Sequence, residues 1–188
     1  MKSMTKRLLA ALLAVAALFA RAGCSKSDKA DAAPKDYTKI LHDARPDEDN
    51  EYYMIFSPGK DGKFTAQYGY SDSYDAAQLD EEIRNMLLPL LNLEEDMYTD
   101  FAASVSGMMV QSYGIAIVKP AEGKQQAVSE ALDAYVQSQM QSMEHYLEDQ
   151  YQIAASSHIS TAPTGEVILV CCENPEAVMN AIKTALAA

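Results

Sequence analysis

Residues 113–147 read YGIAIVKPAEGKQQAVSEALDAYVQSQMQSMEHYL, and this stretch decides the fold. Its first seven residues, YGIAIVK, are mostly apolar and predict a strand. After Pro120 apolar residues return every three or four positions, and the other side is Gln, Ser, Glu and Asp, which predicts a long amphipathic helix. The apolar positions are Val128, Leu132, Tyr135, Val136, Met140, Met143 and Leu147. A one-sided helix next to a strand indicates a helix that lies on a sheet.

The neighbouring segments extend this sheet. Apolar residues alternate in DFAASVS (100–106), which predicts the preceding strand. QIAASSHIS (152–160) and EVILVCCE (166–173) predict the last two strands, joined by the turn-forming residues TAPTG. Asn174 and Pro175 are typical of the cap and the first position of a final helix. The order from residue 99 is therefore β-β-α-β-β-α.

This order predicts an α+β fold, a two-layer sandwich with a mainly antiparallel sheet. Both late helices are one-sided, and we expect them to cover the same face of the sheet. A β-hairpin (51–56 and 63–70) and a helix beginning near Asp75 come before this core. Asp75 and Gln78, three residues apart, predict a capping box at the start of that helix. Residues 37–188 are expected to form a single α+β domain.

Two segments could serve either packing or binding. The hairpin carries tyrosines that favour cross-strand packing, although an exposed tyrosine ladder could also bind a partner. The apolar connection GMMVQ (107–111) joins two predicted strands, where loops are normally polar. It either folds under the sheet or forms an exposed adaptable patch, and we expect burial.

The first 36 residues predict export. MKSMTKR is basic, and LLAALLAVAALFA (8–20) is too short to span a bilayer but suits a secretory signal. Residues 1–23 then form a lipoprotein-type signal peptide in which small residues precede Cys24, the expected site of lipidation. Cleavage after Ala22 is the alternative and would give a secreted protein. The polar stretch 24–36 is expected to be a flexible tether between the lipid and the domain.

Charge limits the partners that this surface can accept. The chain has 27 acidic and 15 basic residues and a net charge of −12. Loss of residues 1–23 removes four basic residues and no acidic one, which brings the net charge to −16. Such a surface disfavours nucleic acid and anionic lipid head groups. Cys171 and Cys172 lie in an apolar run and are expected to be small buried hydrophobic residues.

Three further stretches carry a family resemblance: AIVKPAEGKQQAVSEAL (116–132), YLEDQYQIA (146–154) and GEVILVCCE (165–173). With the pattern K-P-x-E-G before a long helix, the region from Leu87 to Leu186 resembles a family of bacterial lipoproteins known as domain of unknown function 4358. The resemblance implies a small α+β domain behind a lipoprotein signal, and it brings no activity, cofactor or catalytic residue. It favours lipidation of Cys24.

The candidate residues for catalytic or metal-binding chemistry include three histidines, His42, His145 and His158. His145 precedes Glu148 and Asp149 by three and four residues, so one helical face could hold a metal ion. The chain contains no H-E-x-x-H, G-x-S-x-G or phosphate-binding loop. We therefore expect a non-enzymatic binding or accessory module without a cofactor. It would be lipid-anchored on the extracytoplasmic side and could contact another envelope protein or peptide. The alternative is a metal-dependent envelope enzyme that uses His145.

Overall fold

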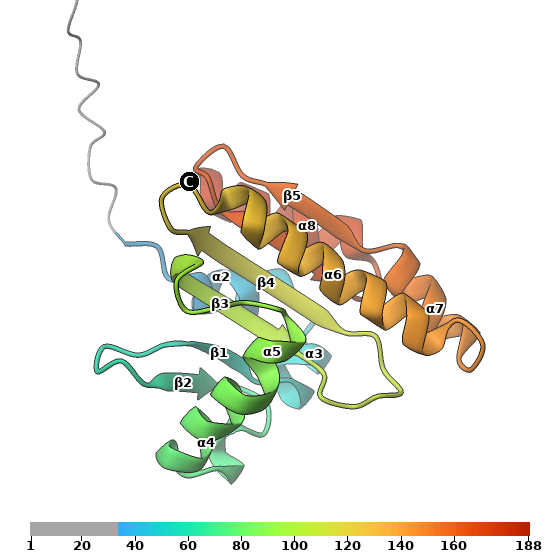
Figure 1. Ribbon diagram of the computed structural model, residues 1–188, viewed down its shortest axis with the longest axis horizontal. Coiled ribbons are helices and arrows are strands. Elements are labelled where there is room, and N and C mark those ends of the chain that lie inside the picture. The colour runs from blue at the N-terminus through green and yellow to red at the C-terminus, as the bar shows by residue number, and fades with distance from the viewer. Residues whose placement is uncertain (1–33) are drawn as a thin grey trace, which may run out of the picture. The chain divides into compact units, whose positions relative to one another are not determined.

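The computed structural model describes residues 34–188, and residues 35–188 form one compact unit. Its centre is a six-stranded sheet in the order β2-β1-β3-β4-β6-β5, in which every neighbouring pair is antiparallel (Figure 1). The strands are β1 (Ile55–Pro58), β2 (Phe64–Gln67), β3 (Tyr98–Val105), β4 (Gly114–Pro120), β5 (His158–Thr161) and β6 (Val167–Cys171). The predictions of an α+β fold, an antiparallel sheet and a leading hairpin are confirmed.

Most helices lie where the sequence predicts them. They are α2 (Tyr37–Ala44), α3 (Asp47–Tyr52), α4 (Ala76–Glu82), α5 (Leu88–Leu90), α6 (Gln125–Met143), α7 (Glu148–Ala155) and α8 (Pro175–Ala187). A 3-10 turn, η1 (Ser71–Ser73), precedes α4, and a π-helical segment, η2 (Ile83–Leu87), joins α4 to α5. The predicted capping box is present, because Asp75 accepts from the backbone N–H of Gln78 while the Gln78 side chain accepts from that of Asp75. None of the helices between residues 34 and 188 is long and apolar enough to cross a membrane.

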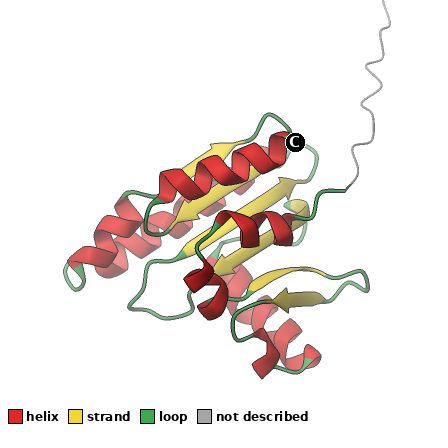
Figure 2. Ribbon diagram, turned by 180° about the vertical axis from the view of Figure 1, so that it is seen from behind, coloured by secondary structure: helices red, strands yellow, loops and turns green. Residues whose placement is uncertain are grey.

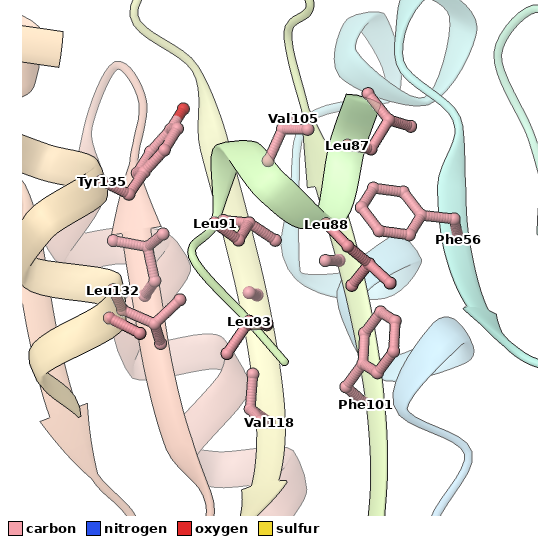
Figure 3. Close-up of a cluster of buried hydrophobic side chains, with 14 of the residues drawn as sticks. Phe56, Leu87, Leu88, Leu91, Leu93, Phe101, Val105, Val118, Leu132 and Tyr135 are labelled. Carbon is pink, nitrogen blue, oxygen red and sulfur yellow. The ribbon is translucent and has the colours of Figure 1, made fainter. Parts of the chain in front are cut away.

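Helices cover both faces of the sheet, whereas both late helices were expected on one. Helix α6 and the α4–η2–α5 segment lie on the first face, where Leu132 and Tyr135 pack toward Leu91 and Phe101 (Figure 3). Helices α2 and α8 lie on the other face, behind the sheet in Figure 1 and in front of it in Figure 2.

The central strands explain why a single helical layer is not enough. All five residues of β6 are buried, and the first five residues of β4 are buried as well. Ile115 and Ile117 point to the face of α2 and α8, while Ala116 and Val118 point to the face of α6. A strand that is apolar at every position has two apolar faces, and each needs a covering layer.

One local prediction is wrong, and the predicted cap at Asn174 is confirmed in position only. The strand expected over residues 152–160 begins only at His158, because residues 148–155 form α7. Glu148 and Asp149 occupy the first turn of α7, where negative charge stabilises a helix. Asn174 does precede α8, but it has φ 54° and its side chain makes no capping hydrogen bond. Pro175 supplies the fixed backbone angle of the first turn, as predicted.

Candidate functional site

The two ends of the sheet differ, and we name them for the segments that they carry. At the loop end, Val105 of β3 pairs with Gly114 of β4, which also pairs with Cys171 of β6. The segments continuing from this end are 47–53, 106–113, 144–149 and 172–176. The opposite end is the tether end, where Lys35 bonds the carbonyl of Leu186 near the end of α8. The loop between β3 and β4 and the start of the described chain lie at opposite ends of the sheet in Figure 1.

The loop between β3 and β4 is held in place by its own polar residues. The Ser106 N–H donates to the Tyr113 carbonyl at 3.0 Å, and the Ser106 hydroxyl oxygen accepts from the Met108 N–H at 3.2 Å. Gln150 of α7 accepts from the N–H of Ser112 at 2.9 Å. The base of the loop is thereby joined to both the sheet and a helix.

Its tip exposes three consecutive apolar side chains. Met108, Met109 and Val110 are 58%, 87% and 52% exposed, so the expected burial of this connection is wrong. Helices already occupy both faces of the sheet, and no apolar layer is left for the loop to enter. Side chains of this kind, adjacent in sequence and held outward, are typical of an interaction site.

Two tyrosines extend the apolar character of the loop end. Tyr52, at the end of α3, and Tyr146, in the turn between α6 and α7, are both exposed. Tyr53 and Tyr113 stack at 3.9 Å between ring centroids beside the base of the loop. Tyr68 lies 4.2 Å from the ring of His42. Of the tyrosines in the predicted hairpin region, Tyr53 and Tyr68 therefore pack against other rings, whereas Tyr52 is exposed to solvent.

Beneath this surface lies a buried cation that the sequence analysis did not identify. Arg45 is only 5% exposed, and its guanidinium donates four hydrogen bonds. The acceptors are Asn50 Oδ1 at 2.6 Å, Ser104 Oγ at 2.7 Å, Tyr113 Oη at 3.2 Å and the Tyr53 carbonyl at 2.6 Å. These bonds join the end of α2 to α3, to β3 and to the residue before β4, so Arg45 fixes the position of the strands and helices that carry the loop.

The titratable groups around Arg45 have shifted pKa values. Burial raises the pKa of Asp49, although the nearby Arg45 charge opposes the shift. Burial also raises the pKa of Tyr113, more than Arg45 lowers it. The hydroxyl of Tyr113 therefore stays protonated at neutral pH. The cluster has a structural role. The Arg45 guanidinium already donates four hydrogen bonds to protein acceptors, which leaves little of it free to bind a ligand.

A second polar cluster lies at the tether end. Glu166 is buried and accepts hydrogen bonds from Tyr37, at 2.9 Å, and from Thr164. Burial alone would raise the pKa of Glu166, but these hydrogen bonds and that of its own backbone together lower it. Burial and the neighbouring Glu166 raise the pKa of Tyr37. The cluster attaches the first turn of α2 to the residue before β6, and this structural role explains why Glu166 is hydrogen-bonded to Tyr37 and Thr164.

The residues proposed for a metal site do not come together. Helix α6 ends at Met143, so His145 does not share a helical face with Glu148 and Asp149. The His145 side chain is 89% exposed, and its only carboxylate neighbour within 4 Å in the described chain is Glu144, at 3.9 Å. Within residues 34–188, no three His, Cys, Asp or Glu side chains form a group that could hold a metal ion.

The other predicted residues have simple positions. His42 lies beside Asp43 at 3.0 Å on α2, and His158 is exposed at the start of β5. Cys171 and Cys172 are free and buried on opposite faces, as adjacent strand residues must be. Burial raises the pKa of Cys172 to about 12, which keeps its thiol protonated and unreactive. Cys24 lies outside the described residues.

Comparisons with known proteins place the chain in a family. The family described as "Domain of unknown function (DUF4358)" matches residues 71–172, a little over half of the chain. The match runs from η1 to the end of β6 and leaves out the tyrosine hairpin. No match was found among curated proteins or among solved structures. The chain therefore belongs to the DUF4358 family.

Proposed function

We propose that this protein is a lipid-anchored, non-enzymatic binding module on the extracytoplasmic side of a membrane. Three features support the proposal: the signal-like residues 1–23, Cys24 behind small residues, and the polar stretch that follows. Two acyl chains anchor a protein stably, since each buried CH₂ contributes about 0.8 kcal/mol. The domain would then project from the membrane on residues 24–36.

The observation that carries the binding role is the exposed apolar tip of the loop between β3 and β4. The loop stands at the loop end, whereas the described chain begins at the tether end, where Lys35 bonds the Leu186 carbonyl. A partner could therefore approach Met108 and Met109 from the end of the domain opposite to Lys35. Methionine side chains are flexible and polarisable, so such a surface can adapt to the shape of a partner.

Anchoring is tested by cell fractionation of the wild-type chain and a Cys24→Ser variant. The wild-type protein is expected in the membrane fraction, and the variant in the soluble extracytoplasmic fraction. An Arg21→Leu variant is the matched control, since it alters the signal but keeps the cysteine. Wild-type protein that is already soluble would contradict the proposal.

The binding role is tested by photo-crosslinking in living cells. A benzophenone amino acid replaces Met109, and the control carries it at Met86, which is 51% exposed on η2. A discrete crosslinked species is expected from position 109 and none from position 86. Identical patterns at the two positions would remove the loop as a docking site.

A further inference from the structure

Charge is divided unequally between the two ends of the domain. The four segments of the loop end, 47–53, 106–113, 144–149 and 172–176, contain nine acidic residues and no lysine or arginine. Arg45 lies beneath them, but it is buried and donates four hydrogen bonds to protein acceptors. The lysines near the tether end are Lys35, Lys60, Lys63, Lys119, Lys124 and Lys183.

Apolar side chains and carboxylates are interleaved at the loop end. Glu48 and Glu51 are exposed on α3 beside Tyr52, and Glu148 is exposed at the start of α7 after Tyr146. Gln150 ties the loop bearing Met108 and Met109 to the same helix. The exposed methionines thus stand between two acidic segments. Each of these segments also displays a tyrosine.

This combination excludes several occupants on physical grounds. An anionic membrane or a nucleic acid would be repelled by the carboxylates. A second copy docked through the same surface would place two acidic ends against each other. A neutral apolar partner would leave the surrounding carboxylates partly desolvated and unpaired.

We propose that the loop end docks a basic amphipathic segment of another protein, with apolar side chains against Met108–Val110 and flanking Lys or Arg side chains against the carboxylates of α3 and α7. This inference rests on the proposed binding role and specifies the chemistry of the partner. Opposite charges around an apolar centre speed association and select the partner, while burial of the apolar side chains supplies affinity.

The test uses a labelled helical peptide of Leu and Lys, about 14 residues long, and a matched peptide in which Glu replaces Lys. The full chain is reconstituted in zwitterionic nanodiscs, and empty nanodiscs give the blank. Fluorescence anisotropy is expected to show tighter binding of the Lys peptide than of the Glu peptide. Raising the salt from about 0.05 M to about 0.5 M should weaken binding of the Lys peptide.

Matched variants separate the apolar and the charged contributions. Met108→Gln with Met109→Gln should weaken binding of the Lys peptide about tenfold or more, while Met86→Gln leaves it unchanged. Replacing Glu48, Glu51 and Glu148 by Gln should weaken binding and flatten its salt dependence. Replacing three exposed carboxylates elsewhere, Glu81, Glu94 and Glu122, should have a much smaller effect.

Several results would overturn the inference while leaving anchoring at Cys24 intact. These are failure of the Lys peptide to bind, equal binding of both peptides, or equal losses in the loop variants and their controls. Two others would assign the surface to a different occupant. One is binding of the Cys24→Ser chain to phosphatidylglycerol vesicles through Met108 and Met109. The other is a dimer of the chain that those two substitutions abolish. Failure of fractionation, in contrast, would remove the membrane role without bearing on peptide binding.

Discussion

Replacing Arg45 by methionine should destabilise the domain strongly, although no catalytic role is assigned to this residue. Methionine keeps much of the aliphatic stem but removes the four hydrogen bonds donated by the guanidinium. Ser104 and Tyr113 are buried and would each lose a donor. The Asn50 side chain and the Tyr53 carbonyl belong to less buried residues, where water can replace the lost bond more easily.

The magnitude follows from these two classes of acceptor. A buried polar group left without a partner costs about 1–3 kcal/mol, so Ser104 and Tyr113 together account for about 2–6 kcal/mol. Removing a buried cation offsets part of this cost, because its desolvation penalty disappears. We expect the free energy of unfolding to fall by about 2–4 kcal/mol, a large fraction of the 5–15 kcal/mol typical of a domain.

Urea denaturation of chains carrying Cys24→Ser measures this difference without interference from lipid. Lys124→Met is the control, because Lys124 forms an exposed ion pair with Asp96 at 2.6 Å and its loss should cost less than about 1 kcal/mol. Adding Ser104→Ala to Arg45→Met should restore part of the stability, since it removes one orphaned hydroxyl. A loss no larger than that of Lys124→Met, or a further large loss in the double variant, would refute the reasoning.

Three other predictions concern the strands and the base of the loop. Gly114→Ala should destabilise by about 1–3 kcal/mol in thermal denaturation, because the added Cβ would lie 2.6 Å from the hydroxyl of buried Tyr135, whereas Gly107→Ala meets nothing within 4 Å; equal effects would contradict this. Ser112→Ala should be neutral or stabilising by up to about 1 kcal/mol, since its buried hydroxyl has no hydrogen-bond partner among residues 34–188, and a clear loss in chemical denaturation would show that it has one. The pKa of Glu166 is lowered in the folded protein, so the ionised carboxylate should stabilise the fold relative to a Glu166→Gln variant. This stabilisation should be fully present above the ordinary pKa of 4.5 and should disappear as the pH falls through the lower pKa of the folded protein. A difference in the free energy of unfolding that does not change with pH in urea titrations would refute the prediction.

The sequence predicted the elements whose signals are local and strong. The apolar run of β4, the three- and four-residue spacing of α6 and the capping box at Asp75 each specify structure within a few residues. These signals come from the chain's own geometry, and tertiary packing reinforces them. They were enough to predict an antiparallel sheet with helices packed on it.

Features set by distant contacts could not be predicted in the same way. Met108 and Met109 are exposed in a fold whose two sheet faces are covered by helices from distant parts of the chain, and the residues of the loop do not report that packing. Helix α7 replaces part of a predicted strand because QIAASS has weak alternation and its acidic start stabilises a helix. Arg45 belongs to no recognisable sequence motif, because its hydrogen-bond acceptors lie up to 68 positions away along the chain. A signal was present only in the rarity of arginine, which occurs twice between residues 34 and 188.

The lipid anchor is the central claim, and mass spectrometry of the mature protein's first residue tests it most directly. Protein extracted from membranes should begin at Cys24 and carry the added mass of a diacylglyceryl group on its sulfur. A mature chain that begins at an unmodified Gly23, and that washes free of membranes, would contradict the account.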